Sequence, residues 1–101
     1  MIIYNTTFNI APGFEERFLD FLKQEYILDC LNTQLLKNPR FMKLLGDLPD
    51  EGSTYSLQFD CNRIEDYIDF ESRHAADLQQ GITEKYGENC LFFSSVLEVL
   101  W

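Results

Sequence analysis

An alternating stretch near the middle of the chain places the strongest constraint on the fold. From Ser53 to Cys61, every second residue is apolar: Tyr55, Leu57, Phe59 and Cys61. The residues between them are polar: Thr54, Ser56, Gln58 and Asp60. Because successive side chains of a strand point to opposite faces, this pattern predicts a β-strand with one buried face. The sheet that contains this strand must therefore have one covered side and one more polar side.

The other segments arrange themselves around this strand in a recognisable order. Alternation predicts strands over Ile2–Ile10 and 91–101, and a less regular apolar stretch with a bulge or bend at Gly46 predicts one over 40–48. Helical spacing predicts helices over about 14–31 and over 62–86, the second capped by Asn62 and ended by Gly87. The βαββαβ order predicts a ferredoxin-like α+β fold: a four-stranded antiparallel sheet, first and third strands central, with two helices on one face.

Length and charge limit the domain count and the classes of partner. With 101 residues the chain is expected to form a single domain over 1–101. Its net charge of −9, from 17 acidic and 8 basic residues, argues against nucleic acid, because phosphate contacts need clustered Lys and Arg. The same charge argues against binding to an anionic membrane surface. We therefore expect no nucleic-acid partner and no membrane partner.

Cysteine usage and missing motifs bear on compartment, metals and cofactors. Cys30, Cys61 and Cys90 are widely spaced and form no metal-binding pattern, so free thiols and a cytoplasmic location are expected. No signal peptide is expected before the first strand. Asp66 and Asp69 can share one side of a helix turn and hold a divalent ion, but a solvated helix face is the simpler interpretation. No phosphate-binding loop or dinucleotide fingerprint occurs, so we predict neither a metal site nor a cofactor.

The face that the helices leave open is expected to be mixed in character. Its polar side chains should be Asn5, Thr7, Asn9, Ser56, Gln58, Ser94 and Glu98. Its apolar side chains should be Ile3, Phe92 or Val96, and part of the stretch 41–45. Such a face is too apolar to be wholly solvated and too polar for a dry core. The sequence therefore predicts a homodimer in which two sheets pack face to face.

Three stretches of the sequence resemble a known family. They are the opening Met-Ile-Ile-Tyr-Asn-Thr-Thr, the block Asp50–Phe59 (Asp-Glu-Gly-Ser-Thr-Tyr-Ser-Leu-Gln-Phe) and the Leu-Glu-Val at 97–99. Over nearly its whole length the chain resembles an uncharacterised bacterial family, domain of unknown function four-two-eight-six. That family resembles the dimeric α+β barrel superfamily, which includes cofactor-free monooxygenases, haem-degrading enzymes and isomerases. Several of those enzymes place a His on the first helix, whereas Lys23–Tyr26 here contains none, which argues against haem binding and His-based catalysis there.

A few polar side chains are candidates for contacting a ligand, and each has a structural alternative. His74, the only histidine, borders the buried stripe of the second helix and can serve as a base or ligand, or simply pack. Tyr55 and Tyr26, like Tyr4 and Tyr67, can hydrogen-bond a ligand between helices and sheet, or be core tyrosines with satisfied hydroxyls. Asn5 and Gln58 lie on strands expected to be central, where they can line a cavity or pair across a dimer interface.

Three functions remain open from the sequence. The first is a homodimeric ligand-binding or regulatory domain without catalysis, suggested by the lack of a nucleophile–base pair. The second is a cofactor-independent monooxygenase or isomerase acting on a small aromatic substrate, which follows from superfamily analogy and requires a closed pocket where His74 or a Tyr meets Asn side chains. The third is a structural or protein-binding dimer, which should show an exposed apolar patch and no cavity.

Overall fold

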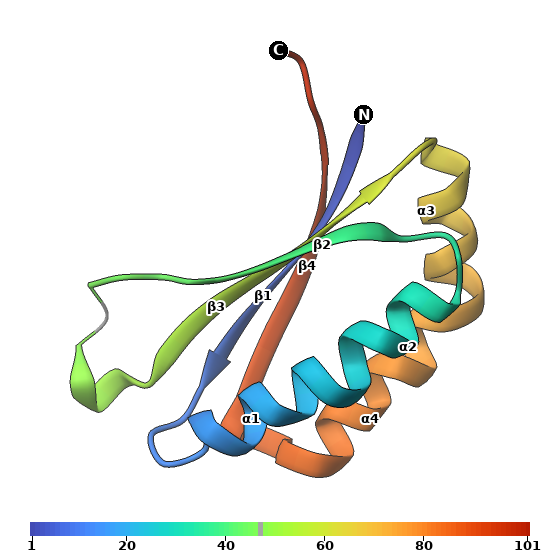
Figure 1. Ribbon diagram of the computed structural model, residues 1–101. Coiled ribbons are helices and arrows are strands. Elements are labelled where there is room, and N and C mark those ends of the chain that lie inside the picture. Colours follow the sequence, from blue (N-terminus) through green and yellow to red (C-terminus); the bar gives the residue numbers. More distant parts are fainter. Residues whose placement is uncertain (47) are drawn as a thin grey trace.

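The structure, a computed structural model, describes residues 1–46 and 48–101 and has the predicted order of elements (Figure 1). The strands are β1 (Ile2–Ile10), β2 (Lys37–Lys43), β3 (Ser53–Cys61) and β4 (Cys90–Glu98). The α-helices are α1 (Glu15–Phe21), α2 (Ile27–Asn32), α3 (Ile64–Phe70) and α4 (Ala76–Tyr86). π-helical segments Leu22–Tyr26 and Glu71–Ala75 join α1 to α2 and α3 to α4, and short 3-10 turns occupy Pro49–Glu51 and Gly87–Asn89.

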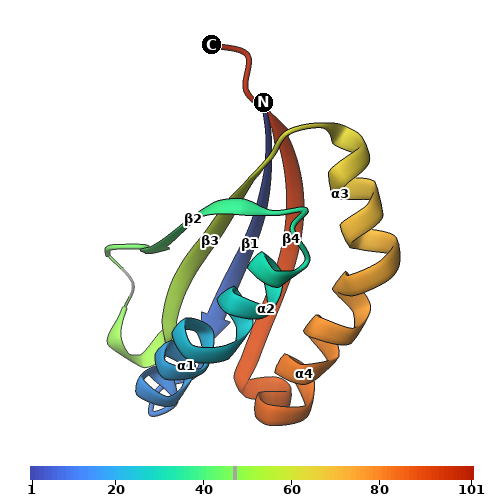
Figure 2. The same cartoon turned by 45° about the vertical axis from the view of Figure 1, so that its right-hand side comes forward.

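The four strands form one antiparallel sheet in the order β2-β3-β1-β4, so β1 and β3 are central as predicted. Figure 2 shows that the rod built from α1 and α2 and the rod built from α3 and α4 lie on the same side of this sheet. The other side of the sheet, the open face, is not covered by any described helix (Figure 1). This arrangement confirms the ferredoxin-like fold.

The alternation in β1 and β3 decides which side chains enter the core. Tyr4 stands opposite Phe59, and Phe8 stands opposite Tyr55. These four side chains are buried against the helices, together with Phe18 from α1. Burial of such large rings supplies most of the stabilisation available to a chain of this size.

The phase of β4 differs from the prediction. Ser94 pairs with Thr6 and Glu98 pairs with Ile2, so both point to the helix side rather than to the open face. Phe92 and Val96 also point to the helix side, and their partly buried side chains pack against the core. The sequence could not settle this phase because β4 is apolar at both parities, whereas its pairing with β1 fixes it. The open face therefore receives Leu91, Phe93, Ser95 and Leu97 from β4.

The π-helical segments explain how both helical rods keep their apolar residues on the core. Phe18, Leu22, Tyr26 and Cys30 are all buried, although residues four apart rotate by about 40° per step on an α-helix. The wider π turn at Leu22–Tyr26 reverses part of that drift. In the second rod the buried pair Phe70 and Ala75 is five residues apart across the other π segment. Apolar residues spaced four and five positions apart in the sequence therefore indicated the π-helical segments.

Three predicted details near β2 and α3 are wrong. The strand predicted over 40–48 is Lys37–Lys43, so Gly46, expected as a bulge or bend within it, lies beyond its end in a turn with φ +97°. Position 47 lies outside the described residues. Asn62 does not cap α3, because Arg63 holds the N-cap position. The Asn62 side-chain oxygen instead accepts a hydrogen bond from the Lys37 ammonium, which links the end of β3 to the start of β2.

Candidate functional site

The layer between helices and sheet is packed with aromatic rings. The Phe8 and Phe18 ring centroids are 5.2 Å apart, and those of Tyr4 and Phe70 are 5.3 Å apart. All four side chains are fully buried. Rings at such separations are in direct contact, so they fill the space in which the sequence allowed for a chamber.

A hydroxyl network crosses one side of this layer. The Tyr4 hydroxyl donates a hydrogen bond to Ser94 Oγ at 3.1 Å and accepts one from Gln79 Nε2 at 3.2 Å. The Thr6 and Ser94 hydroxyls lie 2.9 Å apart and are also hydrogen-bonded. Burial raises the pKa of Tyr4, which keeps its phenol neutral and able to donate. The network therefore ties β1 to β4 and α4, and it satisfies the polar atoms that the core encloses.

Tyr26 and His74 are not brought together by the fold. Tyr26 is buried on its π-helical segment, where its hydroxyl lies beside the Cys30 thiol and burial raises the pKa of both groups. His74 is half-buried on the other π-helical segment, with its ring centroid 6.2 Å from that of Phe70. Neither side chain lies beside an Asn of the sheet, because Asn5 points to the open face. These two candidates thus occupy separate packing positions.

The polar strip of the open face is where Asn5 and Gln58 meet. Asn5 and Gln58 are directly opposite each other in the β1–β3 pairing. Asn5 Oδ1 accepts a 2.6 Å hydrogen bond from Ser56 Oγ, and Asn9 Nδ2 donates a 3.2 Å bond to Thr54 Oγ1. The strip runs along the two central strands and comprises Asn5, Thr7, Asn9, Thr54, Ser56 and Gln58. Its side chains hold one another in place, which suits a surface that meets another polar surface.

Apolar side chains border this polar strip on both sides. On β4 the side chains of Leu91, Phe93 and Leu97 are 63%, 64% and 47% exposed. On the β2 side Met42 and Leu44 are 42% and 55% exposed. Exposed large apolar side chains gathered on one face are typical of an interaction surface rather than of a solvated one. We call these two groups the β4 margin and the β2 margin.

One end of the polar strip is held by a charged cluster. Arg40 Nη2 donates to Asp60 Oδ1 at 2.9 Å, and Asn38 Nδ2 donates to Asp60 Oδ2 at 3.0 Å. The hydrogen bonds from Arg40 and Asn38 lower the pKa of the Asp60 carboxyl. Since the ion pair lies near solvent, its contribution to stability is modest.

Replacing Asp60 with asparagine should make stability less dependent on acid pH. A carboxyl whose pKa is lower in the folded chain stabilises it above the unfolded value of about 3.9, and that stabilisation disappears as the pH falls through the folded value. We expect Asp60→Asn to lower the free energy of unfolding at pH 7 by about 0.5–1 kcal/mol and to leave it nearly unchanged once the wild-type carboxyl is protonated. Urea unfolding across the acid range would measure this, and identical pH profiles for both proteins would contradict it.

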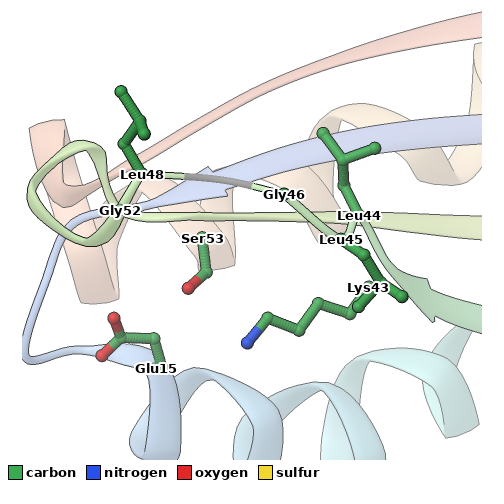
Figure 3. A pocket seen from close by; sticks show the side chains of 8 residues that line it. All are labelled: Glu15, Lys43, Leu44, Leu45, Gly46, Leu48, Gly52 and Ser53. Atoms are coloured by element: carbon green, nitrogen blue, oxygen red, sulfur yellow. The ribbon is translucent and has the colours of Figure 1, made fainter.

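A groove lies on the helix side of the β2 edge, where α1 faces β2. One hollow of about 320 Å³ lies between α1 and the turn that joins β2 to β3 (Figure 3). Its polar lining is Glu15, Lys43 and Ser53, and the rest of its lining is Leu44, Leu45, Gly46, Leu48 and Gly52. A second hollow of about 310 Å³ adjoins it at Lys43 and is lined also by Leu19, Lys23, Phe41, Met42 and Tyr55. We call the two hollows together the α1–β2 groove.

The sequence did not indicate Glu15 and Lys43 as residues of one groove. By its position in the sequence, Glu15 is a carboxylate in the first turn of a helix, where it suits the helix dipole, and Lys43 is a polar residue of an irregular strand expected to point outward. In the structure Lys43 pairs with Tyr55 and therefore shares the helix side with it. Lys43 and Phe41 are two residues apart and therefore share one face of the strand. The sequence alone did not show that this face borders α1. Of the sequence candidates, Tyr55 alone lines the groove.

The described residues also bear on membranes and metals. None of the helices in the described ranges is long and apolar enough to span a membrane. Within residues 1–46 and 48–101, no three His, Cys, Asp or Glu side chains gather as a set that could hold a metal ion. Asp66 instead forms a 3.2 Å ion pair with Arg63.

Comparison with known proteins gives one family and many similar folds. Residues 1–100 match the family described as Domain of unknown function (DUF4286), and no curated protein matches. A dimeric ferredoxin-like protein from an uncultured marine organism is similar at 15% identity and TM-score 0.70, covering 100% of this chain and 96% of that one. A protein of the ethyl tert-butyl ether d (EthD) family from Bacillus halodurans is similar at 7% identity and TM-score 0.66, covering 98% of this chain and 100% of that one.

A third similar structure is described as an antibiotic biosynthesis monooxygenase, with 13% identity, a TM-score of 0.64 and complete coverage of both chains. At such low identity these likenesses establish the fold alone. They agree with the ferredoxin-like architecture and with the expected resemblance to dimeric α+β barrel proteins.

Proposed function

The chain belongs to the family described as Domain of unknown function (DUF4286), and because that description assigns no activity, we propose from its own residues that it is a homodimeric ligand-binding domain without catalysis. Two copies pack through their open faces. A small molecule binds at the edge of β2. The observation that carries this proposal is the open face itself, with a polar strip between two apolar margins.

That face is complementary to a second copy of itself. A twofold axis parallel to the strands would lay the β4 margin of one copy over the β2 margin of its partner, and strip over strip. Leu91 and Phe93 would then leave water opposite Leu44 and Met42, at the end of the face away from the Arg40–Asp60 ion pair. The hydroxyls and amides of the strip would meet their counterparts directly or through water. The similar marine protein is described as a dimeric ferredoxin-like protein, which supports this assembly.

The packed core and the α1–β2 groove together favour ligand binding over catalysis. The enzyme hypothesis needs His74 or a tyrosine beside Asn side chains in a closed pocket, whereas Phe8, Phe18 and Phe70 fill the layer under the helices. A purely structural dimer needs no cavity, whereas the α1–β2 groove offers hollows of ligand size. A binding domain agrees with both observations.

Placing a charge in the β4 margin should separate the two copies. We expect the wild-type chain to sediment as a dimer at micromolar concentration. Phe93 is 64% exposed in the isolated chain, so Phe93→Asp should fold normally but raise the dimer dissociation constant by about 30-fold or more, because a buried carboxylate would lack a partner. Analytical ultracentrifugation over a concentration series measures both quantities.

A matched variant on the helix side controls for the added charge. Leu28 on α2 is also half exposed, and Leu28→Asp should leave the dimer intact. A monomeric wild-type chain would overturn the assembly. Equal weakening by Leu28→Asp and Phe93→Asp would move the interface away from the open face.

A further inference from the structure

The α1–β2 groove carries the opposite charges of Glu15 and Lys43 at one end, and at the other an apolar wall of Leu19, Phe41 and Tyr55 with Lys23 beside it. We propose that it binds a small zwitterion with an apolar side chain, such as a free α-amino acid. This inference rests on the binding role proposed above and names the class of ligand that the groove would take.

The polar end of the groove offers a separate partner for each charge of such a ligand. Glu15, Lys43 and Ser53 line the same hollow; Figure 3 shows the Lys43 ammonium extended toward α1 and the Glu15 carboxylate beside the loop that precedes α1. In the part of the chain that the structure describes, the Lys43 ammonium forms no ion pair with Glu15. The Glu15 carboxylate accepts a 3.0 Å hydrogen bond from the Gly13 backbone N–H, which orients it and leaves its other oxygen available.

Two opposed charges also select against ligands that carry only one. A simple carboxylate would gain Lys43 but face Glu15, and a simple amine would gain Glu15 but face Lys43 and, in the second hollow, Lys23. A zwitterion satisfies both at once, and the Ser53 hydroxyl can bond to either of its ends. The charge arrangement therefore favours a molecule with an ammonium and a carboxylate close together.

The apolar end of the groove is formed by the neighbouring residues of α1 and β2. Leu19 follows Glu15 by four residues on α1, so the two share a helix face with their Cβ atoms about 5–6 Å apart. Phe41 precedes Lys43 by two residues on β2 and shares its side of the sheet. The Phe41 ring stacks on Tyr55 with centroids 5.4 Å apart, which forms a flat apolar wall.

The sizes and spacing of these parts suit a single small ligand. The charged pair Glu15 and Lys43 and the apolar pair Leu19 and Phe41 stand side by side, about one helical turn apart. The hollows, at about 320 Å³ and 310 Å³, lie at the lower end of the range usual for ligand pockets. The backbone charges of an amino acid would occupy the first hollow and its side chain the second.

Three probes with the same apolar body would test the ligand class on the full chain. They are phenylalanine, 3-phenylpropionate, which lacks the amine, and 2-phenylethylamine, which lacks the carboxylate. Titrations followed by NMR amide shifts should show phenylalanine binding at millimolar concentration or below, about tenfold or more tightly than either single-charge probe. The shifts should map to the groove, at Glu15, Lys43 and Ser53.

Two variants assign each charge of the ligand to its partner. Lys43→Gln and Glu15→Gln should each weaken phenylalanine binding about tenfold, and each should reduce its preference over the probe that lacks the corresponding charge. Glu16→Gln, which changes the exposed neighbouring carboxylate, and Lys85→Gln, which removes an ammonium on α4, should leave affinity unchanged. Amide spectra of all four variants establish that they are folded.

Each other outcome overturns the inference. Phenylpropionate binding as tightly as phenylalanine, with Glu15→Gln neutral, would make the ligand a simple anion. Shifts confined to the open face would place binding elsewhere, and no shift with any probe would remove the zwitterion site. None of these results alters the sedimentation of Phe93→Asp, so the homodimer stands or falls separately.

Discussion

Replacing Phe18 with alanine is expected to lower the free energy of unfolding by about 3–5 kcal/mol. The Phe18 side chain is fully buried, and its ring centroid lies 5.2 Å from that of Phe8, 5.9 Å from Tyr55 and 5.8 Å from Tyr86. Removing the ring therefore opens a cavity bordered by the helix rods and the sheet. Because domains of this size are stable by only about 5–15 kcal/mol, the variant should be close to unfolding at room temperature.

A neighbouring phenylalanine provides the comparison for this measurement. Phe14 is only partly buried, with the Arg17 guanidinium 4.9 Å from its ring centroid, so Phe14→Ala should cost distinctly less than Phe18→Ala. Urea unfolding of both variants beside the wild type, analysed with a common slope, gives the two differences. Equal losses would mean that the rings under the helices are less closely packed than their centroid separations imply.

The sequence predicted the fold most reliably where local pattern and burial agree. In β3 the period of two was unambiguous, and Tyr55, Leu57 and Phe59 are buried as expected. In β4 both parities are apolar, so Ser94 was assigned to the wrong face until its pairing with Thr6 was known. Register between strands depends on contacts distant in sequence, which a local pattern does not contain.

The start of β2 was missed for a related reason. The backbone of Asn38 adopts φ +51° and Pro39 follows it, which reads as a loop in the sequence. The strand nevertheless begins at Lys37, because it pairs with Asp60 before a register shift between Lys37 and Arg40. An edge strand tolerates a proline and such an irregularity on its unpaired side. The hydrogen bonds to Asp60 help to hold this irregular start.

The candidate residues show the same division between local and distant information. Asn5 and Gln58 were both expected on the open face of the central strands, because strand parity and strand order determine the face, and the structure shows that they are also directly paired. The charged pair of the α1–β2 groove was not expected. Its members belong to a helix and an edge strand whose separation depends on how the rod of α1 and α2 sits on the sheet. Spacing within one element carries no information about that separation.

Replacing Gly52 with alanine is expected to lower the free energy of unfolding by about 3 kcal/mol or more, since strained backbone alone costs about 1–3 kcal/mol. Gly52 has φ +82° and ψ −168°, a conformation that is essentially restricted to glycine. A Cβ atom at this position would lie 2.2 Å from the backbone oxygen of Ile10, so the backbone itself would have to move. The following residue, Ser53, pairs with Ile10, and the displacement would therefore disturb the β1–β3 register at its end.

Substitutions at two other glycines separate the conformational cost at Gly52 from the cost of the close approach to Ile10. Gly13 has φ +90° but no atom within 4 Å of an added Cβ, so Gly13→Ala should show only the conformational cost, about 1–2 kcal/mol. Gly81 lies within α4 with the same open space, so Gly81→Ala should instead stabilise the chain by about 0.5–1 kcal/mol. Chemical denaturation of the three variants should thus give a large loss, a moderate loss and a gain. If Gly52→Ala matched Gly13→Ala, the close approach to Ile10 would contribute nothing, and the tight junction between β1 and β3 would have to be looser than the structure places it.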